Sequence, residues 1–222
     1  QTYAVGSRGS LAPRGLPFKL YGGRPTSIVP DPQRQVLYAT LEAFDAFVVL
    51  GYDDAGALSG IQLRQAGEGV CSLAVHPFEP RLYTVARAEG TLRSFAIDEA
   101  TLQVAEVSSQ PAGLEPVQVV VDTLGERLLT ICRGSRELAS WTLGDGSQPP
   151  AKDSAYALRG TPNKIGCAVG DRPAAWLPCF VHVVATESEQ VSSYTIDGSD
   201  GSVDNSGAVE LPGRTPSTIV LD

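Results

Sequence analysis

Three charged side chains occupy the same place in a pattern that recurs along the chain. Glu42, Arg87 and Arg133, with Thr186 as the fourth member of the set, each follow the second apolar stretch of a repeated unit. If the units are equivalent pieces of one ring, these side chains lie around one mouth of its central channel. Two guanidinium groups there would bind a carboxylate or a phosphate through their planar forks of donors. Glu42 would act as a general base or balance their charge. We therefore predict Arg87 and Arg133 as ligand-binding residues.

An alternative interpretation gives these positions no chemistry. Charged residues in turns are commonly solvated, and exposed ion pairs contribute little to stability. The two arginines would then pair with Glu89, Glu137 or Asp122. This interpretation predicts surface charges in place of a binding site.

The two histidines are further candidates. His76 ends an apolar stretch in AVHP and is a candidate catalytic residue, because histidine can act as a general base near neutral pH. We prefer to interpret it as a hydrogen-bonded residue of a turn. His182 alternates with apolar residues in CFVHVVA, which favours a hydrogen-bonded group in a core or an interface. Two well-separated histidines do not form a metal site, so we predict no metal and no cofactor.

The elements that must position these residues are repeated. SFAIDEATLQV, from Ser94, is nearly restated as SYTIDGSDGSV, from Ser193. The Asp or Gly that ends the first half of this phrase recurs 45 to 53 residues apart, at Gly6, Asp53, Asp98, Gly144 and Asp197. A second phrase leads the units as SIVPDP, SLAVHP, QVVVD and TIVLD, and a third follows it as VLYATLE, RLYTVAR, RLLTICR and FVHVVAT. Such a period indicates a repeat architecture.

Each unit predicts four short antiparallel strands. The apolar residues alternate with period two, are rich in Val, Ile, Leu, Thr and aromatic residues, and are bounded by Gly, Pro, Asp and Ser. A four-stranded sheet repeated about every 40 to 50 residues is typical of a β-propeller blade. Neighbouring blades cover both faces of such a sheet, so we expect the runs SIV, VVV and TIV of the innermost strands to be buried. We predict an all-β fold, a β-propeller of four-stranded antiparallel blades, with a β-sandwich or a solenoid as the alternative.

The phrases divide the chain, which we treat as one domain over residues 1–222, into about five blade equivalents. Four full blades are expected, at residues 24–66, 67–112, 113–159 and 160–212. Residues 2–23 would supply only the outer strands of a further blade, and residues 213–222 only an innermost strand. The two ends therefore look like parts of one shared blade. A longer propeller, or a partner chain that completes the ring, would explain the same pattern.

The stretches HPFEPRLYTVARAEGTLRSFAIDEATLQV and VVVDTLGERLLTICRGSRELASW resemble the lactonase-type β-propellers. These are the 6-phosphogluconolactonase-like and carboxymuconate-cyclase-like proteins, whose blades read HP, LYVAN, VxxFxID and TGxL. The resemblance covers nearly the whole chain in rhythm, but only residues 72–104 and 180–203 closely. Members of this family have seven blades, so the resemblance implies that the chain is incomplete by about two.

Two departures from the family pattern bear on function. Arg87 and Arg133 stand where the LYVAN motif has Asn. The family also has a Pro-His-His stretch that opens a blade on the catalytic side, and here that place reads TPNKIG, with Asn163 and Lys164 in place of the two histidines. The second departure counts against the family's enzymatic activity.

Cysteines and one tryptophan provide structural expectations. Cys167 and Cys179 lie on presumed neighbouring strands of one blade, and we predict a disulfide between them. Cys71 and Cys132 are expected to be buried thiols that behave as small hydrophobic groups. Trp176 lies in the insertion GDRPAAWLP, where it would anchor an interface or cap the edge of its own blade.

The charge of the chain limits its partners. The net charge is −8, and no stretch concentrates Lys or Arg, so nucleic acid and anionic membranes are poor partners. No apolar run approaches the length of a membrane-spanning helix. The chain begins with Gln1 and contains no Met, which is compatible with removal of a secretory signal peptide and favours an extracellular location.

Three functions remain open. We favour a non-catalytic propeller scaffold that binds a protein partner or other copies of itself, because open blade edges can pair with another chain. The alternative is a lactone hydrolase or cyclising isomerase that acts on a small anionic substrate at the channel mouth. A second alternative is a small-molecule or sugar binder that uses the same mouth without chemistry.

Overall fold

The computed structural model confirms an all-β chain. It describes residues 2–14, 16–20, 22–146, 148–169, 179–185, 187–197 and 199–212, without the side chains of residues 2, 167–169 and 179. These residues form one two-stranded and four four-stranded sheets, with a single short 3-10 helix, η1 (Glu42–Phe44). No helix in this part of the chain is long and apolar enough to cross a membrane.

Each four-stranded sheet is an antiparallel run of consecutive strands. The first blade contains β3 (Pro25–Asp31), β4 (Val36–Leu41), β5 (Ala46–Tyr52) and β6 (Leu58–Gln65). The second contains β7 (Val70–Val75), β8 (Arg81–Ala86), β9 (Thr91–Ile97) and β10 (Val104–Pro111). The third contains β11 (Pro116–Val121), β12 (Arg127–Cys132), β13 (Glu137–Thr142) and β14 (Ala151–Ala157). The fourth contains β15 (Lys164–Val169), β16 (Cys179–Ala185), β17 (Gln190–Ile196) and β18 (Val203–Glu210).

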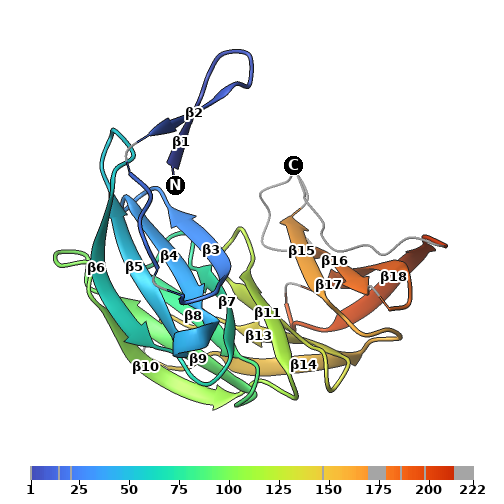
Figure 1. Ribbon diagram of the computed structural model, residues 1–222. Coiled ribbons are helices and arrows are strands. Elements are labelled where there is room, and N and C mark those ends of the chain that lie inside the picture. Colours follow the sequence, from blue (N-terminus) through green and yellow to red (C-terminus); the bar gives the residue numbers. More distant parts are fainter. Residues whose placement is uncertain are drawn as a thin grey trace.

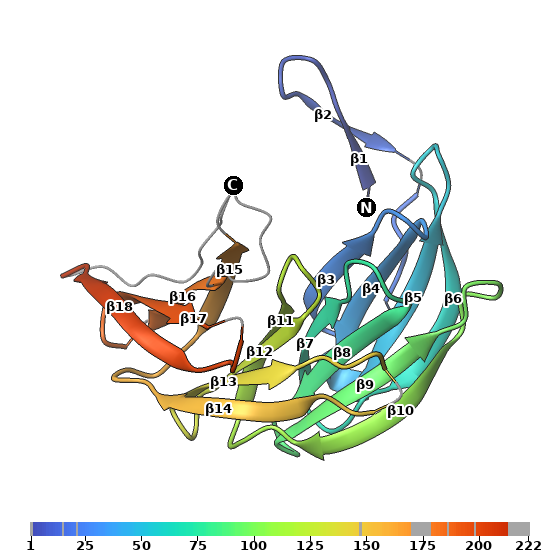
Figure 2. The same ribbon diagram turned by 180° about the vertical axis from the view of Figure 1, so that it is seen from behind.

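The four blades follow one another along an arc (Figures 1 and 2), which confirms the β-propeller prediction. The first strand of each blade lies on the inner side of the arc and the fourth on the outer side. Consecutive inner strands contact one another, from β3 to β7, from β7 to β11 and from β11 to β15. The inner strands therefore line a common channel on the concave side of the arc.

The core lies between the blades. Tyr38 and Phe47 of the first blade pack against Leu82 and Phe95 of the second, and the Phe47 and Phe95 rings meet edge to face at 5.2 Å between centroids. Similar clusters join the second blade to the third and the third to the fourth. β8 and β12 are buried almost throughout, because each has a neighbouring blade on both faces.

The first inner strand departs from the expected burial. Ile28 of β3 is 65% exposed, and in the run VVV of β11 only Val119 is fully buried, whereas the run TIV lies outside the described residues. Ile28 lies opposite Ala39, on the face of the first blade that points away from the second. No blade of the described chain covers that face. Phe18 and Leu20 pack on part of it instead, against a cluster that includes Ala39.

The N-terminal segment forms a separate hairpin. β1 (Thr2–Val5) pairs with β2 (Leu11–Arg14) in antiparallel register. Both views show the hairpin standing apart from the four blades, beyond the first one. Residues 213–222, the expected inner strand of a blade shared with this hairpin, lie outside the described residues. The shared blade therefore stays a prediction.

A buried acceptor closes the turn after the first strand in three blades. Asp31, His76 and Asp122 occupy this place, and each is only 4% exposed. Their side chains accept backbone N–H bonds of 2.9 to 3.3 Å from residues two to five positions later. His76 is thus a hydrogen-bonded turn residue, as we preferred to interpret it. An aspartate and a histidine perform the same task because both present an acceptor close to the backbone.

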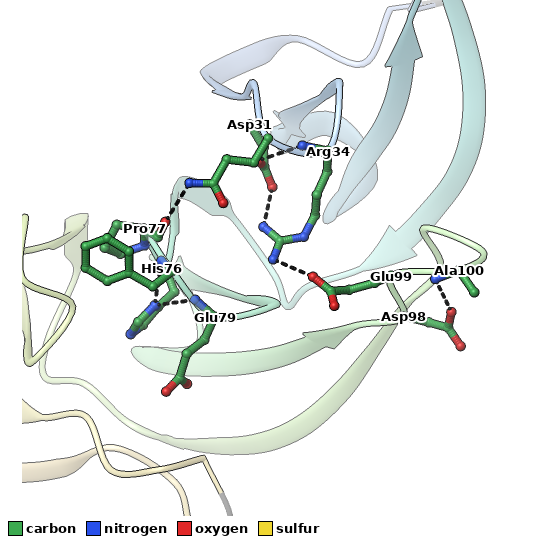
Figure 3. A network of polar contacts seen from close by, with 10 residues as sticks. Asp31, Arg34, His76, Pro77, Glu79, Asp98, Glu99 and Ala100 are labelled. Carbon is green, nitrogen blue, oxygen red and sulfur yellow. Dashed lines mark hydrogen bonds and ion pairs between the residues drawn. The ribbon is translucent and has the colours of Figure 1, made fainter.

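The same turns join neighbouring blades, as Figure 3 shows for the first and second. Arg34, whose side chain is 8% exposed, binds Asp31 at 3.0 Å in its own turn and Glu99 of the second blade at 3.0 Å. His76 accepts with Nδ1, so its proton lies on Nε2, which donates to the carbonyl of Gly125 in the third blade at 2.9 Å. These bonds connect neighbouring blades on the face of the propeller at which the inner strands end.

Replacing His76 tests its structural role. His76→Ala leaves the N–H groups of Phe78 and Glu79 and the carbonyl of Gly125 without their partner, so we expect the free energy of unfolding to fall by about 3 kcal/mol. His76→Asn keeps a short side-chain acceptor, like Asp31 and Asp122 in the first and third blades. Its free energy of unfolding should fall by about half as much. Urea unfolding measures both. Equal losses in the two variants would show that the acceptor is not what matters.

Asp122 predicts a dependence of stability on pH. Burial raises the pKa of this carboxyl, against the opposing effect of the N–H groups of Arg127 and Glu126. A raised folded pKa means that the folded state binds the proton more tightly, so the contribution of Asp122 to stability falls as the pH rises above the ordinary value of about 3.9. Asp122→Asn keeps an acceptor oxygen and buries no charge. Its Tm relative to wild type should therefore increase between about pH 3 and pH 7.

The matched control is Asp122→Ala, which loses the acceptor as well as the charge. It should be less stable than wild type by about 1 to 3 kcal/mol. Thermal unfolding followed by circular dichroism at several pH values gives both results. A Tm difference between Asp122→Asn and wild type that does not change with pH would contradict the raised pKa.

Candidate active site at the channel mouth

A repeated backbone bond places the predicted site residues at equivalent points. In three blades, the residue before the first strand is in the left-handed conformation, and its carbonyl accepts an N–H from the residue that follows the second strand. The pairs, carbonyl first, are Arg24 and Glu42 (3.3 Å), Gly69 and Arg87 (3.0 Å), and Glu115 and Arg133 (2.8 Å). The three predicted residues therefore lie on the same face of the propeller, the face at which the inner strands begin. Thr186, the fourth member of the set, lies outside the described residues.

Glu42 and Arg87 meet across the boundary between the first and second blades. Oε1 of Glu42 lies 3.8 Å from Nη1 of Arg87, and Oε2 lies 3.8 Å from Nη2 of Arg24. The side chain of Glu42 is 28% exposed and that of Arg87 is 43% exposed. These separations exceed those of a hydrogen-bonded ion pair. The carboxylate thus lies between two cations without a hydrogen bond to either, and it remains accessible to water and to a small molecule.

Cys71 and Lys164 lie at the same mouth. Burial raises the pKa of the Cys71 thiol. The charge of Arg87 and a hydrogen bond with its side chain lower this pKa, Glu42 raises it and Lys164 lowers it, so all three charges act on this one sulfur. The thiol itself points into the structure, with Sγ 3.3 Å from the carbonyl oxygen of Pro116. A buried thiol with a raised pKa is a poor nucleophile. Cys71 therefore marks the site without supplying its chemistry.

Lys164 faces the channel from the fourth blade. It is the first residue of β15 and lines a channel segment of about 370 Å³ together with Cys71, Ser72 and Gln118. A second hollow, of about 720 Å³, begins at Arg87 and runs between the second and third blades past Gly113. A ligand at Arg87 therefore has room both toward the channel and toward this groove.

Arg133 is held elsewhere. Its Nη2 lies 3.2 Å from Oε1 of Glu187, and both side chains are more than half exposed. A hydrogen bond from Thr161 and, after it, Arg133 lower the pKa of Glu187. Among the described residues, no contact joins the guanidinium groups of Arg87 and Arg133. The structure thus brings Arg87 together with Glu42, whereas Arg133 faces the fourth blade.

The partners proposed for these arginines under the alternative interpretation were wrong. Glu89 pairs with Arg93 at 2.7 Å, and Glu137 pairs with Lys152. The carboxylate of Asp122 accepts backbone N–H bonds in its buried turn. Arg133 is nevertheless a largely solvated loop charge, in the sense of that interpretation.

The structure does not place His76, the candidate general base, at this mouth. The residue follows the end of β7, whereas Arg87 follows the end of the antiparallel neighbour β8, so the two lie at opposite ends of the blade. Both ring nitrogens of His76 are bonded to backbone groups. His182 is hydrogen-bonded as predicted, with Nδ1 2.8 Å from Oγ of Ser193.

Several predictions fall on parts that the structure does not describe. Trp176 and the side chains of Cys167 and Cys179 lie outside the described residues, so the interface role and the disulfide stay predictions. The backbone register pairs Cys167 with Val181. Cys71 and Cys132 are free and buried, as expected. Within the described ranges, no cluster of three or more His, Cys, Asp or Glu side chains could hold a metal ion.

Sequence reasoning underestimated two residues of this mouth. Arg24 was not singled out, because it precedes a strand and carries no motif. Lys164 was noted only as a departure from the Pro-His-His stretch of the lactonase-type propellers. That stretch was nevertheless a usable signal, since it marks the beginning of an inner strand on the side where Glu42 and Arg87 lie.

Known proteins resemble the chain in fold. No protein-family model and no curated protein matches its sequence. The periplasmic gluconolactonase PpgL of Pseudomonas aeruginosa is similar over 97% of this chain and 64% of its own, with a TM-score of 0.78 and 20% identity. A protein from Lactobacillus plantarum is similar over 95% of this chain and 64% of its own, with a TM-score of 0.76 and 17% identity.

The similarity extends to a protein of a different name. Hydrazine synthase of Kuenenia stuttgartiensis is similar over 87% of this chain and 52% of its own, with a TM-score of 0.63 and 16% identity. At such identities the likeness shows the fold, which is that of the lactonase-type β-propellers, and one fold serves many functions. The chain spans about 64% of the length of the two most similar structures named above.

Proposed function

We propose that the chain belongs to a lactone hydrolase whose reaction takes place at the channel mouth between the first and second blades. The observation that carries this proposal is the Glu42 carboxylate, which lies between the guanidinium groups of Arg24 and Arg87 at 3.8 Å from each. The structural likeness to a gluconolactonase supports it. It replaces the scaffold function that we favoured from the sequence.

The chemistry requires a base and a stabiliser of negative charge. Glu42 accepts a proton from a water molecule, whose oxygen attacks the carbonyl carbon of the lactone. Arg87 and Lys164 stabilise the oxyanion that forms. The tetrahedral intermediate then breaks the ring C–O bond, and protonated Glu42 returns the proton to the leaving alkoxide. The product is the open hydroxy acid, and no other reactant is consumed.

The position of Lys164 answers the objection raised by the TPNKIG stretch. The two histidines of the family pattern are absent, but their place supplies a cation that acts on the same sulfur as Arg87. An ammonium group cannot replace a histidine as a base near neutral pH. It can stabilise an oxyanion, and Glu42 is then the base.

Substitutions in the full-length protein test this assignment. Glu42→Gln removes the base and should lower kcat for hydrolysis of glucono-1,5-lactone by about 100-fold or more. Arg87→Ala removes an oxyanion partner and should lower kcat/KM by a similar factor. Rates are followed by acid release and corrected for spontaneous hydrolysis, with muconate-type lactones assayed beside the sugar lactone.

Arg133→Ala is the matched control, because Arg133 has the same side chain and the same backbone position as Arg87 but faces Glu187. Its kcat/KM should stay within about 2-fold of wild type. A loss as large as that of Arg87→Ala would show that Arg133 also binds the ligand, as predicted from the sequence. Lactone binding without turnover in the wild type would favour the small-molecule binder.

A second candidate is self-assembly through the N-terminal hairpin. Tyr3, Val5 and Leu11 lie on one face of the hairpin and are 54%, 72% and 65% exposed. An isolated two-stranded hairpin is only marginally stable in water. A second copy of the chain that covers this face would bury it.

The native mass of the full chain tests this candidate. Wild type should have a native mass that is an integer multiple of the single-chain mass. The double variant Val5→Ser, Leu11→Ser should have the single-chain mass. Ala4→Ser, on the opposite face of the same strand, is the control and should leave the complex intact. A single-chain mass for the wild type at all concentrations would remove the candidate. Sedimentation velocity gives these masses.

A further inference from the structure

We propose that Asp45 is a positioning residue that holds Glu42 and Arg87 at their working separation. This inference rests on the proposed lactone hydrolysis. Asp45 touches neither side chain of the pair according to the contacts of the structure, and it acts through backbone bonds that connect the two blades on which the pair is carried.

The backbone of Asp45 belongs to the repeat. It is left-handed, with φ 52° and ψ 35°, and its N–H donates to the carbonyl of Glu42 at 3.3 Å. Left-handed residues precede the third strand in all four blades, at Asp45, Gly90, Arg136 and Glu189. The carbonyl of each accepts an N–H from the residue that follows the fourth strand, at 2.7 to 2.8 Å. Any of several residue types therefore serves this backbone position.

The side chain of Asp45 adds a bond to the next blade. Its Oδ1 accepts the N–H of Gly69 at 2.8 Å, and the carbonyl of Gly69 accepts the N–H of Arg87 at 3.0 Å. One hydrogen-bonded path thus runs from Glu42 through Asp45 and Gly69 to Arg87. A bond between a carboxylate and an N–H is stronger than one between neutral groups.

Gly69 lies where two segments of the backbone approach each other. It is left-handed with φ +71°, and a Cβ there would lie 3.2 Å from the backbone nitrogen of Ala88. The backbones of the loop before β7 and the turn after β8 are therefore in close contact. A shift at Gly69 would move Arg87 with it.

The pair depends on this placement because it does not hold itself. Glu42 and Arg87 approach only to 3.8 Å, without a hydrogen bond, and both are partly exposed. Exposed charges at that separation attract one another weakly. Their relative position therefore depends on the two backbones that carry them, together with the hydrogen bond between Arg87 and Cys71. Catalytic rates are sensitive to displacements of about 1 Å.

Two variants of the full-length protein test the inference. Asp45→Ala should lower kcat for the lactone by about 10-fold or more, with a smaller change in KM. Asp45→Asn, which keeps an oxygen for Gly69, should retain kcat within about 3-fold. Arg136→Ala is the matched control, because it places alanine at the same left-handed position of the third blade, and it should leave kcat unchanged.

A double-mutant cycle separates positioning from general stability. In the Arg87→Ala background, Asp45→Ala should lower kcat by less than 2-fold, since the pair that Asp45 positions is already lost. A merely structural role would give the same factor in both backgrounds and would overturn the inference.

Amide hydrogen exchange provides a readout that does not depend on activity. Asp45→Ala should speed exchange at Gly69 and Arg87 by about 10-fold relative to Asp45→Asn, while the inner strand β11 exchanges as in wild type. Unchanged exchange at both amides would overturn the inference even if the lactone is hydrolysed. A wild type without lactone hydrolysis, but with the faster exchange in Asp45→Ala, would refute the proposed function and leave the connection between the two blades in place.

Discussion

A four-stranded sheet with two apolar faces is stable in water only where another layer lies on each face. β8 and β12 have a sheet on both sides and are buried almost throughout. On the free face of the first blade, Ile28 stays exposed and Phe18 and Leu20 pack on part of the surface. Because each sheet needs a neighbouring sheet on each face, the blades are arranged one after another around an axis. This arrangement brings the beginnings of the inner strands together at one end of the channel.

The repeat conserves backbone geometry and leaves the side chains to diverge. One backbone bond recurs at Glu42, Arg87 and Arg133, so three different blades deliver a charged group to equivalent points. On the opposite face of the propeller, Asp31, His76 and Asp122 perform the same structural task, although two residue types are used. A histidine in this second set is explained by its turn, and its residue type alone would have suggested catalysis.

The sequence predicted what depends on periodicity. The repeated phrases indicated the fold. Glu42, Arg87 and Arg133, which the repeats align, are structurally equivalent. Ion-pair partners could not be predicted, because they depend on the reach of side chains across a blade boundary. Arg133 thus pairs with Glu187, more than fifty positions away and next to the residue equivalent to itself. The burial of β3 was predicted wrongly, since periodicity does not reveal which face lacks a neighbour.

Arg87 and Arg133 show why a single position does not specify a function in such a ring. Each blade boundary combines a residue of one blade with a residue of the next, and the boundary with Glu42 places a carboxylate 3.8 Å from each of two guanidinium groups. Asp45 adds its bond to Gly69 at that same boundary. Lys164 lines the channel from the fourth blade, so the spacing of the blades around the channel is itself part of the candidate site. A substitution that tilts the fourth blade without touching the mouth should therefore act on the site through Lys164 and spare the contact between Glu42 and Arg87.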